Sequence, residues 1–256
     1  MKKLRLLTKI YSSKTDSFTR LKNTINESIS NLNVNLKSIS LNDFGYVNLI
    51  LDGEDEVVAF NYLVTLFGES KNLNDLKEGD IIKGYICTSG KVGFGLFVDI
   101  GIKEPYAVDA LIPLYALRKQ LVNGAKLPVR KIIDAFALVD NVPIEIILTE
   151  ISVGTKKVKA QFSDEQKALF EKWIEEGLDK LYILGVSQEE VEHSLEQTKH
   201  NHDIIEIESL GWMENIITCK FNTTAKGLIP EIGRNLSKAK FEIFSPSKIK
   251  MTVRNE

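Results

Sequence analysis

The middle of the chain places the tightest limit on the fold, because it divides into short apolar segments separated by turn residues. The first segment is entered from a Gly79-Asp80 turn, and a turn of Ser89, Gly90 and Gly93 leads into the second. The segments expected to form strands are 76–87, 94–102, 110–117, 128–138 and 142–151. The third of them runs into a helical turn. Five short strands with one helical turn after the third predict a small Greek-key barrel over residues 75–152.

The residues before the barrel follow a different order. The expected strands are 3–11, 34–41 and 46–51, and the expected helices are 18–32 and 55–67. The strands alternate polar and apolar residues, whereas Phe18, Leu21 and Ile25 recur at helical spacing. This β-α-β-β-α order over residues 1–74 predicts half or more of a ferredoxin-like arrangement. The polar residues 69–75 are expected to form a linker.

The last part of the chain, residues 153–256, is expected to begin with acidic helices and to end in a basic, β-rich module. The expected helices are 163–176, 178–184 and 187–198, and the expected strands are 203–208 and 214–221. Ser163 with Gln166, and Ser187 with Glu190, have the spacing of a capping box, which favours a helix start at each serine.

A short repeat connects the barrel to this last part. The segment GLIPEIGRNL (227–236) echoes ALIPLYALRK (110–119), and both follow an expected strand. The repeat predicts either a degenerate second barrel or a related α/β module in the C-terminal part. Taken with the N-terminal unit and the barrel, it makes the chain a multidomain α+β protein.

The charge of the chain is unevenly distributed. The net charge of −2 gives no overall sign of a nucleic-acid partner. However, residues 1–40 hold eight basic and two acidic residues, and residues 215–256 hold eight and three. Residues 163–214 hold four basic and fourteen acidic residues. The basic segments are expected either to converge on one face or to form an ordinary surface of mixed charge.

The barrel region resembles a known family. The segment GDIIKGYICTSGKVGFGLFVDIG is followed by DALIPLYALRK, and together they resemble the S1 RNA-binding domain, a five-stranded OB-fold barrel. The matching positions are Gly84, Phe94, Gly95, Phe97, Val98, Asp99 and the segment 110–113. Ala110 stands where the family has glycine, and Pro113 stands where it often has histidine. The resemblance covers about 75 of the 256 residues.

The resemblance implies a surface for single-stranded RNA. Phe94 and Phe97 are the expected stacking rings, because an aromatic ring on an OB surface stacks a base for ~1–3 kcal/mol. Tyr85 is expected to add a third ring, and Tyr115 to replace in part the missing histidine. The expected phosphate contacts are Lys83, Lys91, Arg130 and Lys131. The alternative is that Phe94 and Phe97 pack the barrel rim or contact a protein.

The C-terminal part adds a second group of basic residues. The expected phosphate contacts there are Lys220, Lys226, Arg234, Lys238 and Lys240, and the alternative is a solvated surface. The layout of the chain, with the segment Cys219–Leu236, resembles an uncharacterised archaeal family that carries an S1-like barrel. That resemblance implies a role linked to RNA and supplies no catalytic residues.

The sequence gives little support for an enzyme. His193, His200 and His202 lie near Asp203 and Glu206, a set that can bind metal in a hydrolase or nuclease. No second matching motif accompanies them, and histidine is also favoured near a helix C-terminus by the helix dipole. The cysteines, Cys87 and Cys219, lie in expected strands, far from any Cys-x-x-Cys pair, and are expected to be reduced and buried.

These observations favour a cytoplasmic, non-catalytic protein that binds single-stranded RNA through the S1-like barrel. Its expected setting is translation, ribosome function or RNA processing, with the ribosome or an RNA-processing complex as partner. We expect no cofactor, no bound metal, no membrane span and no small-molecule substrate. The first alternative is a protein-docking module of a larger complex. The second is a metal-dependent hydrolase or nuclease that uses His200 and His202.

Overall fold

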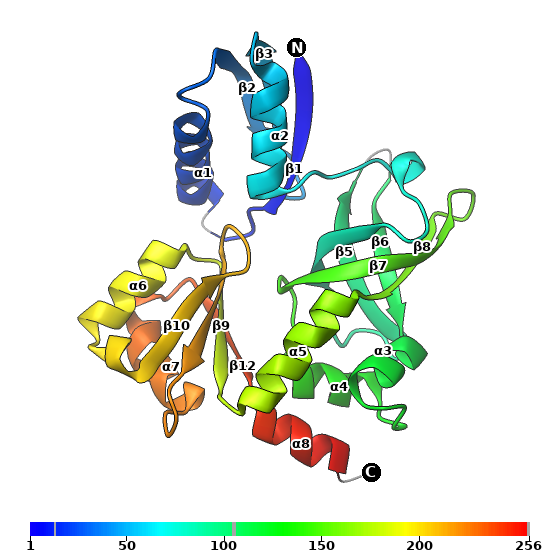
Figure 1. Ribbon diagram of the computed structural model, residues 1–256, viewed down its shortest axis with the longest axis vertical. Coiled ribbons are helices and arrows are strands. Elements are labelled where there is room, and N and C mark those ends of the chain that lie inside the picture. Colours follow the sequence, from blue (N-terminus) through cyan, green and yellow to red (C-terminus); the bar gives the residue numbers. More distant parts are fainter. Residues whose placement is uncertain (13, 104–105, 255–256) are drawn as a thin grey trace.

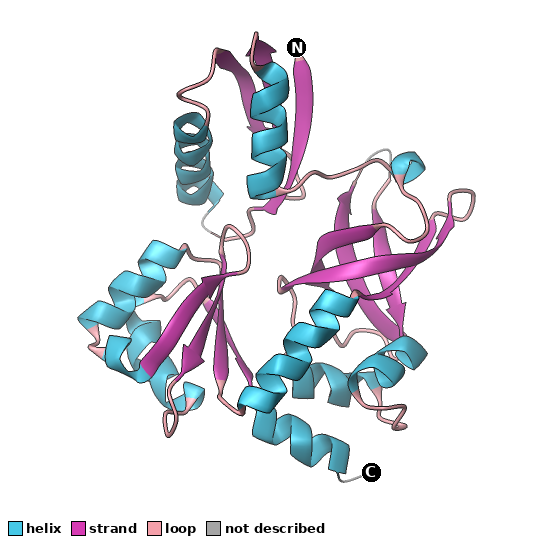
Figure 2. Cartoon of the chain, in the orientation of Figure 1, coloured by secondary structure: helices cyan, strands magenta, loops and turns pink. Residues whose placement is uncertain are grey.

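The computed structural model describes residues 1–12, 14–103 and 106–254, and it shows three units in chain order (Figures 1 and 2). The first unit has a three-stranded sheet, the second is a closed barrel, and the third has a four-stranded sheet. The prediction of a multidomain α+β chain is therefore confirmed.

The N-terminal unit has the predicted β-α-β-β-α order. Its elements are β1 (Lys2–Lys9), α1 (Lys14–Ser28), β2 (Val34–Leu41), β3 (Tyr46–Gly53) and α2 (Glu56–Phe67). The sheet order is β1-β3-β2 with antiparallel pairs. Leu4 and Leu6 of β1 are buried and alternate with more exposed residues, as expected for a sheet with one covered face. An isolated antiparallel bridge joins Leu6 to Glu69 on the other edge of β1.

The barrel closes in the order β4-β5-β6-β8-β7. Its strands are β4 (Ile81–Cys87), β5 (Gly95–Ile102), β6 (Val108–Pro113), β7 (Pro143–Ser152) and β8 (Lys157–Phe162). The pair β6–β8 is parallel, and β4 pairs with both β5 and β7 in antiparallel fashion. A short 3₁₀ helix, Leu73–Asp75, precedes the barrel, and the helices α3 (Leu114–Leu121) and α4 (Val129–Phe136) separate β6 from β7.

Two predictions about the barrel strands were wrong. The segment 128–138 forms α4 and not a strand, because Val129, Ile132 and Phe136 recur at helical spacing and are all buried. The remaining strand of the barrel is β8, which lies beyond the expected boundary at residue 152. The pattern of 128–138 is apolar enough for a strand, but its apolar residues share one helical face.

The C-terminal unit is an α/β module, so of the two alternatives for this part the structure has the α/β module and not a second barrel. Its elements are β9 (Lys180–Leu184), α6 (Gln188–Gln197), β10 (Ile204–Ser209), β11 (Glu214–Cys219), α7 (Ala225–Asn235) and β12 (Lys240–Phe244). The sheet order is β10-β11-β9-β12, and all pairs are antiparallel. The echo at 227–236 therefore lies in a helix, whereas 110–113 lies in strand β6.

The segment 178–184 was predicted as a helix, yet it contains strand β9. All five residues of β9 are buried. Leu181 and Ile183 pack with α6 and α7, while Tyr182 and Leu184 pack in the same core as the barrel. A strand that is covered on both faces has no polar alternation, so its apolar run resembles a short buried helix.

Two further helices connect the barrel to the C-terminal sheet: α5 (Asp164–Glu176) and α8 (Pro246–Arg254). The Ser163 hydroxyl accepts a hydrogen bond from the Gln166 backbone N–H at 3.0 Å, so the predicted cap of α5 is confirmed. The Gln166 side chain does not complete a capping box, because it accepts from the Glu145 N–H instead. The box of Ser187 and Glu190 at α6 is complete.

Candidate nucleic-acid interface

The outer surface of β5 and β6 carries the two phenylalanines that the sequence singled out. Leu96 and Val98 point into the barrel core, and Phe97 lies half-buried on the opposite side of β5. Phe94 is 57% exposed, and its ring meets that of Phe97 edge to face with 6.0 Å between centroids. Leu111 of β6 pairs with Phe97 and extends this apolar surface.

Phe94 is fixed beside the start of α3. Its carbonyl accepts a hydrogen bond from the Leu114 N–H at 2.8 Å. Tyr115 follows directly and is 70% exposed. Gly95 permits this close approach, because a Cβ there would overlap the Ile112 carbonyl. We call the surface formed by Phe94, Phe97, Leu111 and Tyr115 the aromatic face.

Cationic side chains surround the aromatic face. Arg130 at the start of α4 donates from Nε to the Gly90 carbonyl at 3.2 Å, which places it against the loop that carries exposed Lys91. Lys131 is the next residue of α4 and is also exposed. On the other side, Lys159 of β8 pairs in register with Leu111, and its Nζ lies 2.7 Å from Glu150.

Sequence reasoning did not assign Lys159 to the site, although three lysines at 156–159 were a visible signal. Lys156 lies in the same hairpin, with its Nζ 3.6 Å from the centroid of the Tyr106 ring. The β7–β8 hairpin was missed because β8 was not predicted as a barrel strand. Once β8 pairs with β6, Lys159 lies opposite Leu111 at the edge of the aromatic face.

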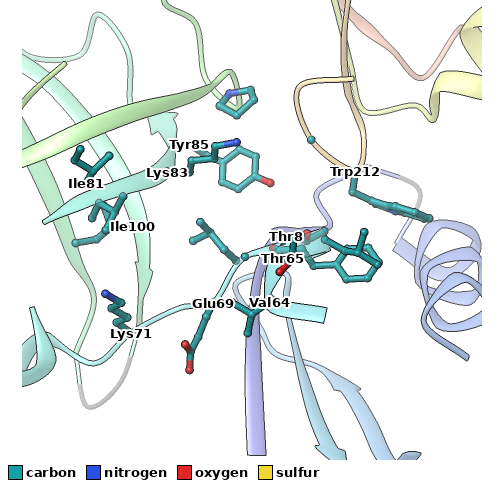
Figure 3. A pocket seen from close by; sticks show the side chains of 18 of the residues that line it. Thr8, Val64, Thr65, Glu69, Lys71, Ile81, Lys83, Tyr85, Ile100 and Trp212 are labelled. Carbon is teal, nitrogen blue, oxygen red and sulfur yellow. Dashed lines mark hydrogen bonds between the residues drawn. The ribbon is translucent and has the colours of Figure 1, made fainter. Parts of the chain in front are cut away.

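Tyr85 and Lys83 do not join the aromatic face. Tyr85 is only 6% exposed, so it has no open ring for a base, and the prediction of a third stacking ring there was wrong. Lys83 is exposed but lines a cavity of about 390 Å³ that has walls from all three units. In Figure 3, Lys83 and Tyr85 project from the barrel toward this cavity, opposite Thr8 and Trp212.

The aspartate of the S1-like motif, Asp99, is used within the chain. Lys9 of the N-terminal unit lies 3.0 Å from it and Lys103 lies 2.8 Å from it. Lys103 also reaches Asp109 at 3.2 Å. Burial by itself raises the pKa of Asp99, but the two ammonium groups outweigh it and hold the pKa below its usual value. The two lysines and the two aspartates together carry no net charge. The Lys9–Asp99 pair attaches the N-terminal unit to the barrel.

A buried carboxyl lies where the three units meet. Glu214 of β11 is fully buried, and burial raises its pKa to about 7. The hydroxyl of Tyr11, which follows β1, faces this carboxyl, and Tyr85 of the barrel lies close to it. The Met213 N–H donates to Glu214 Oε2 at 3.3 Å. A carboxyl in this setting keeps its proton in mildly acidic solution and loses it around neutral pH.

The C-terminal basic residues form a separate group. Lys220, Lys226, Arg234, Lys238 and Lys240 are all exposed. They lie on α7 and its flanks, on the side of the sheet that faces away from the barrel core (Figure 1). Lys238 lies 3.7 Å from Asp16 of the N-terminal unit. At the N-terminus of α7, the Asp179 side chain accepts a hydrogen bond from the Ala225 N–H at 3.4 Å. The structure does not bring these cations to the aromatic face.

The histidines serve local contacts. His200 Nδ1 lies 2.7 Å from Asp203 and its Nε2 lies 3.2 Å from Glu231, so it ties the 3₁₀ turn His200–Asp203 to α7. The hydrogen bond with Asp203 is the main reason that the pKa of His200 is raised. Across the described ranges of the chain, no group of three or more His, Cys, Asp or Glu residues could hold a metal ion. His193 contacts Gln197 at 2.7 Å, and His202 is exposed.

The two cysteines are both free thiols, Cys87 half-buried and Cys219 buried. Burial raises the pKa of Cys87 to about 12 and that of Cys219 to about 11, so neither is a reactive thiolate. Among the residues that the structure describes, no helix has the length and apolar character needed to cross a bilayer.

Fold and surface together define a multidomain α+β protein with a closed five-stranded barrel between two α/β units. Three consecutive family models match the chain: the DUF2110 N-terminal domain at 3–73, the DUF2110 central domain at 76–174 and the DUF2110 C-terminal domain at 178–244. The chain belongs to the DUF2110 family. No curated protein sequence matches it.

Solved structures give only partial similarity. The uncharacterized protein MJ1198 from Methanocaldococcus jannaschii is 14% identical, with 35% of this chain and 96% of that chain covered and a TM-score of 0.24. The a/eIF2alpha-aDim2p-rRNA complex from Pyrococcus horikoshii is 9% identical, with 48% and 64% covered and a TM-score of 0.26. The intact alpha subunit of aIF2 from Pyrococcus abyssi is 9% identical, with 66% and 97% covered and a TM-score of 0.26. TM-scores of this size do not establish a shared overall fold.

Proposed function

We propose that this protein binds single-stranded RNA on the aromatic face of its barrel. The observation that carries the proposal is the edge-to-face pair of exposed Phe94 and half-buried Phe97, flanked by Lys91, Arg130 and Lys159. The strand order β4-β5-β6-β8-β7, with β6 parallel to β8, supports an S1-like barrel of the OB type. The N-terminal order β1-β3-β2 likewise supports a ferredoxin-like unit.

The chemistry of the aromatic face suits unpaired bases. A base that leaves water to stack on Phe94 or Phe97 gains ~1–3 kcal/mol. The surrounding cations attract the phosphates and make binding dependent on salt. Pro113 is buried and cannot supply the base contact of the missing histidine, so stacking dominates over hydrogen-bond readout. The surface is therefore expected to accept many RNA sequences.

The protein acts in this proposal as a non-catalytic factor in translation, ribosome function or RNA processing. Lys220, Lys226, Arg234, Lys238 and Lys240 form a second, independent contact for RNA backbone. Because they lie apart from the aromatic face, they suit a large folded RNA or a ribosomal surface better than a short single strand. The free thiols fit a reducing cytoplasm.

Fluorescence anisotropy with a labelled single-stranded RNA tests the proposal at fixed salt. The double variant Phe94→Ala/Phe97→Ala is expected to lose ~2–4 kcal/mol of binding free energy, which corresponds to two lost stacking contacts. Phe221→Ala is the matched control, since Phe221 is 82% exposed but lies in the C-terminal unit. Unchanged RNA affinity in a folded double variant would refute the proposal.

The same measurement separates the protein-docking alternative. Phe94, Phe97 and Leu111 form a continuous apolar surface, which a protein partner can also cover. If the wild-type chain binds no RNA at low salt, the docking function replaces the RNA function. In that case, the double variant should lose a partner protein that co-purifies with the wild type.

A further inference from the structure

A turn of the N-terminal unit lies against the barrel beside Lys103, which follows strand β5. Phe44 is at the tip of this β2–β3 turn and is 49% exposed. The Asn42 side chain accepts hydrogen bonds from the N–H groups of Phe44 and Tyr46, at 3.0 and 2.9 Å. Gly45 has φ +90° and lies directly against the Ile10 carbonyl. The turn therefore holds the Phe44 ring in a defined place.

Lys103 connects this ring to the barrel. Its Nζ lies 5.6 Å from the centroid of the Phe44 ring and also bonds Asp99 and Asp109. Asp99 is two residues from Phe97 along β5 and therefore on the same side of the strand. Asp109 is related in the same way to Leu111 on β6. Asp99 and Asp109 thus lie about one pair of residues, ~6–7 Å, from Phe97 and Leu111 along their strands. Phe44 is connected to these carboxylates through Lys103.

Of the carboxylates near Phe44, the two of the barrel are neutralised, and Asp43 of the turn itself is exposed to solvent. Asp99 and Asp109 are both paired with ammonium groups, from Lys9 and Lys103. Lys103 also interacts with the Phe44 ring as a cation, and the Phe44 residue is 49% exposed. An exposed aromatic ring on a rigid turn, beside a neutralised pair of carboxylates, suits the π-face of a nucleobase.

We propose that Phe44 is a base-stacking residue for the same RNA, contributed to the barrel surface by the N-terminal unit. This inference rests on the proposed function of the aromatic face. In this proposal the RNA strand runs from Phe94 in the β4–β5 loop, over Phe97 and Leu111, to Phe44. The RNA site is therefore incomplete without the N-terminal unit, and the Lys9–Asp99 ion pair holds its two parts together.

Binding of two oligouridines to the full chain tests this inference. One is about 4 nucleotides long and the other about 10, both within the ~4–16 nucleotides that an OB surface binds. Phe44→Ala is expected to weaken the long RNA about tenfold, the loss of one stacked base, and to leave the short RNA unchanged. Phe94→Ala/Phe97→Ala is expected to weaken both. Tyr62→Ala is the matched control, because Tyr62 is 45% exposed on α2 of the same unit.

The outcomes distinguish the two proposals. If the double variant binds as tightly as the wild type, the proposed function fails and the inference fails with it. If the double variant loses affinity but Phe44→Ala binds the long RNA like wild type, the inference alone fails. Phe44→Leu keeps an apolar side chain on the turn without a ring, so it separates stacking from folding of the turn. Wild-type affinity in Phe44→Leu overturns the stacking role, and tenfold loss supports it.

Discussion

The N-terminal and C-terminal units have the same order of elements but are attached to the barrel by different chemistry. In both sheets the first strand pairs with the third and the third with the second: β1-β3-β2 and β9-β11-β10. In the C-terminal sheet a fourth strand, β12, pairs with the first, and in the N-terminal sheet the same edge of the first strand carries the isolated Leu6–Glu69 bridge. The similarity of topology therefore does not fix how a unit packs in the chain.

The two sheets differ in what covers them. The N-terminal sheet carries its helices on one face, and Lys3, Asn35 and Ser40 on the other face are exposed. The C-terminal sheet is covered on both faces, and one face shares a continuous hydrophobic core with the barrel. The N-terminal unit has a separate core and meets the barrel through Lys9 and Asp99. A shared core makes two units one folding unit, whereas a polar contact allows them to separate.

The largest effect is expected from a break in the shared core. Trp173 of α5 is 2% exposed and lies 5.3 Å from Phe244 and 6.0 Å from Phe170 between ring centroids. Trp173→Ala is expected to lower the free energy of unfolding by ~3–5 kcal/mol, because it leaves a cavity between barrel and C-terminal sheet. Urea unfolding followed by circular dichroism measures the loss.

The control for this variant is Phe221→Ala, a truncation of an exposed ring in the C-terminal unit, which should change the unfolding free energy by less than ~0.5 kcal/mol. Hydrogen exchange adds the comparison between units. Amides of the barrel and of β9 should lose protection together in Trp173→Ala, while β3 of the N-terminal unit keeps its protection. Loss confined to the C-terminal sheet would contradict a shared core.

The next effect concerns pH and the junction of all three units. Glu214 ionises with a pKa of about 7 in the folded chain because burial disfavours its charge. An unfolded glutamate ionises near pH 4.3, so the folded state holds the extra proton between these values. Stability is therefore expected to fall as pH rises from about 4.5 to 7, by ~3 kcal/mol, and then to level off.

Glu214→Gln should remove this dependence, since the amide fills the same volume and does not titrate. Chemical unfolding at pH 5, 6, 7 and 8 measures it, as the slope of unfolding free energy against pH in variant and wild type. Glu189→Gln is the control, because Glu189 is an acidic residue of α6 in the same unit and lies in its solvated first turn. Equal slopes in Glu214→Gln and wild type would show that Glu214 is not the responsible group.

The comparison of the two units also explains what the sequence could predict. The N-terminal strands were predicted well because one face of the sheet is open to solvent. Polar and apolar residues therefore alternate along 34–41, and this alternation is visible in the sequence. Strand β9 was missed because both of its faces are covered, which removes the alternation. Segment 128–138 was missed for the opposite reason: its helical period was present, with Val129, Ile132 and Phe136 on one face, but the expected barrel favoured a strand.

The candidate site was predicted where it depends on local pattern and missed where it depends on tertiary contact. The alternation of β5 places Phe97 outside the barrel, and the position of Phe94 in a glycine-rich turn exposes it. Tyr85 has the same local pattern as Phe97, yet two other units cover it. Phe44 had no local signal, because only the docking of the N-terminal turn on Lys103 brings it to the barrel.

The smallest of these effects is expected where the N-terminal unit meets the barrel. Asp99→Asn removes the charge that pairs with Lys9 and Lys103, while the side-chain shape remains. Lys103 keeps Asp109 as a partner. The substitution is therefore expected to weaken the docking of the N-terminal unit by roughly 2 kcal/mol, less than the penalty for leaving a buried charge without any partner. Because the N-terminal unit has its own core, this loss should loosen its docking and leave its fold intact.

Limited proteolysis in the linker at 69–75 measures that loosening, and cleavage should become faster in Asp99→Asn. Asp52→Asn is the matched control, because Asp52 pairs with Lys37 and the N-terminal amine at the surface, where a pair contributes ~0–1 kcal/mol. Cleavage at the wild-type rate would mean that apolar contacts hold the N-terminal unit in place without the ion pair. These contacts are made by Tyr46, by Phe44 and by Phe67, whose ring centroid lies 6.1 Å from that of Trp212. The N-terminal unit would then be attached by apolar contacts, as the C-terminal unit is, and the chemical difference between the two attachments would disappear.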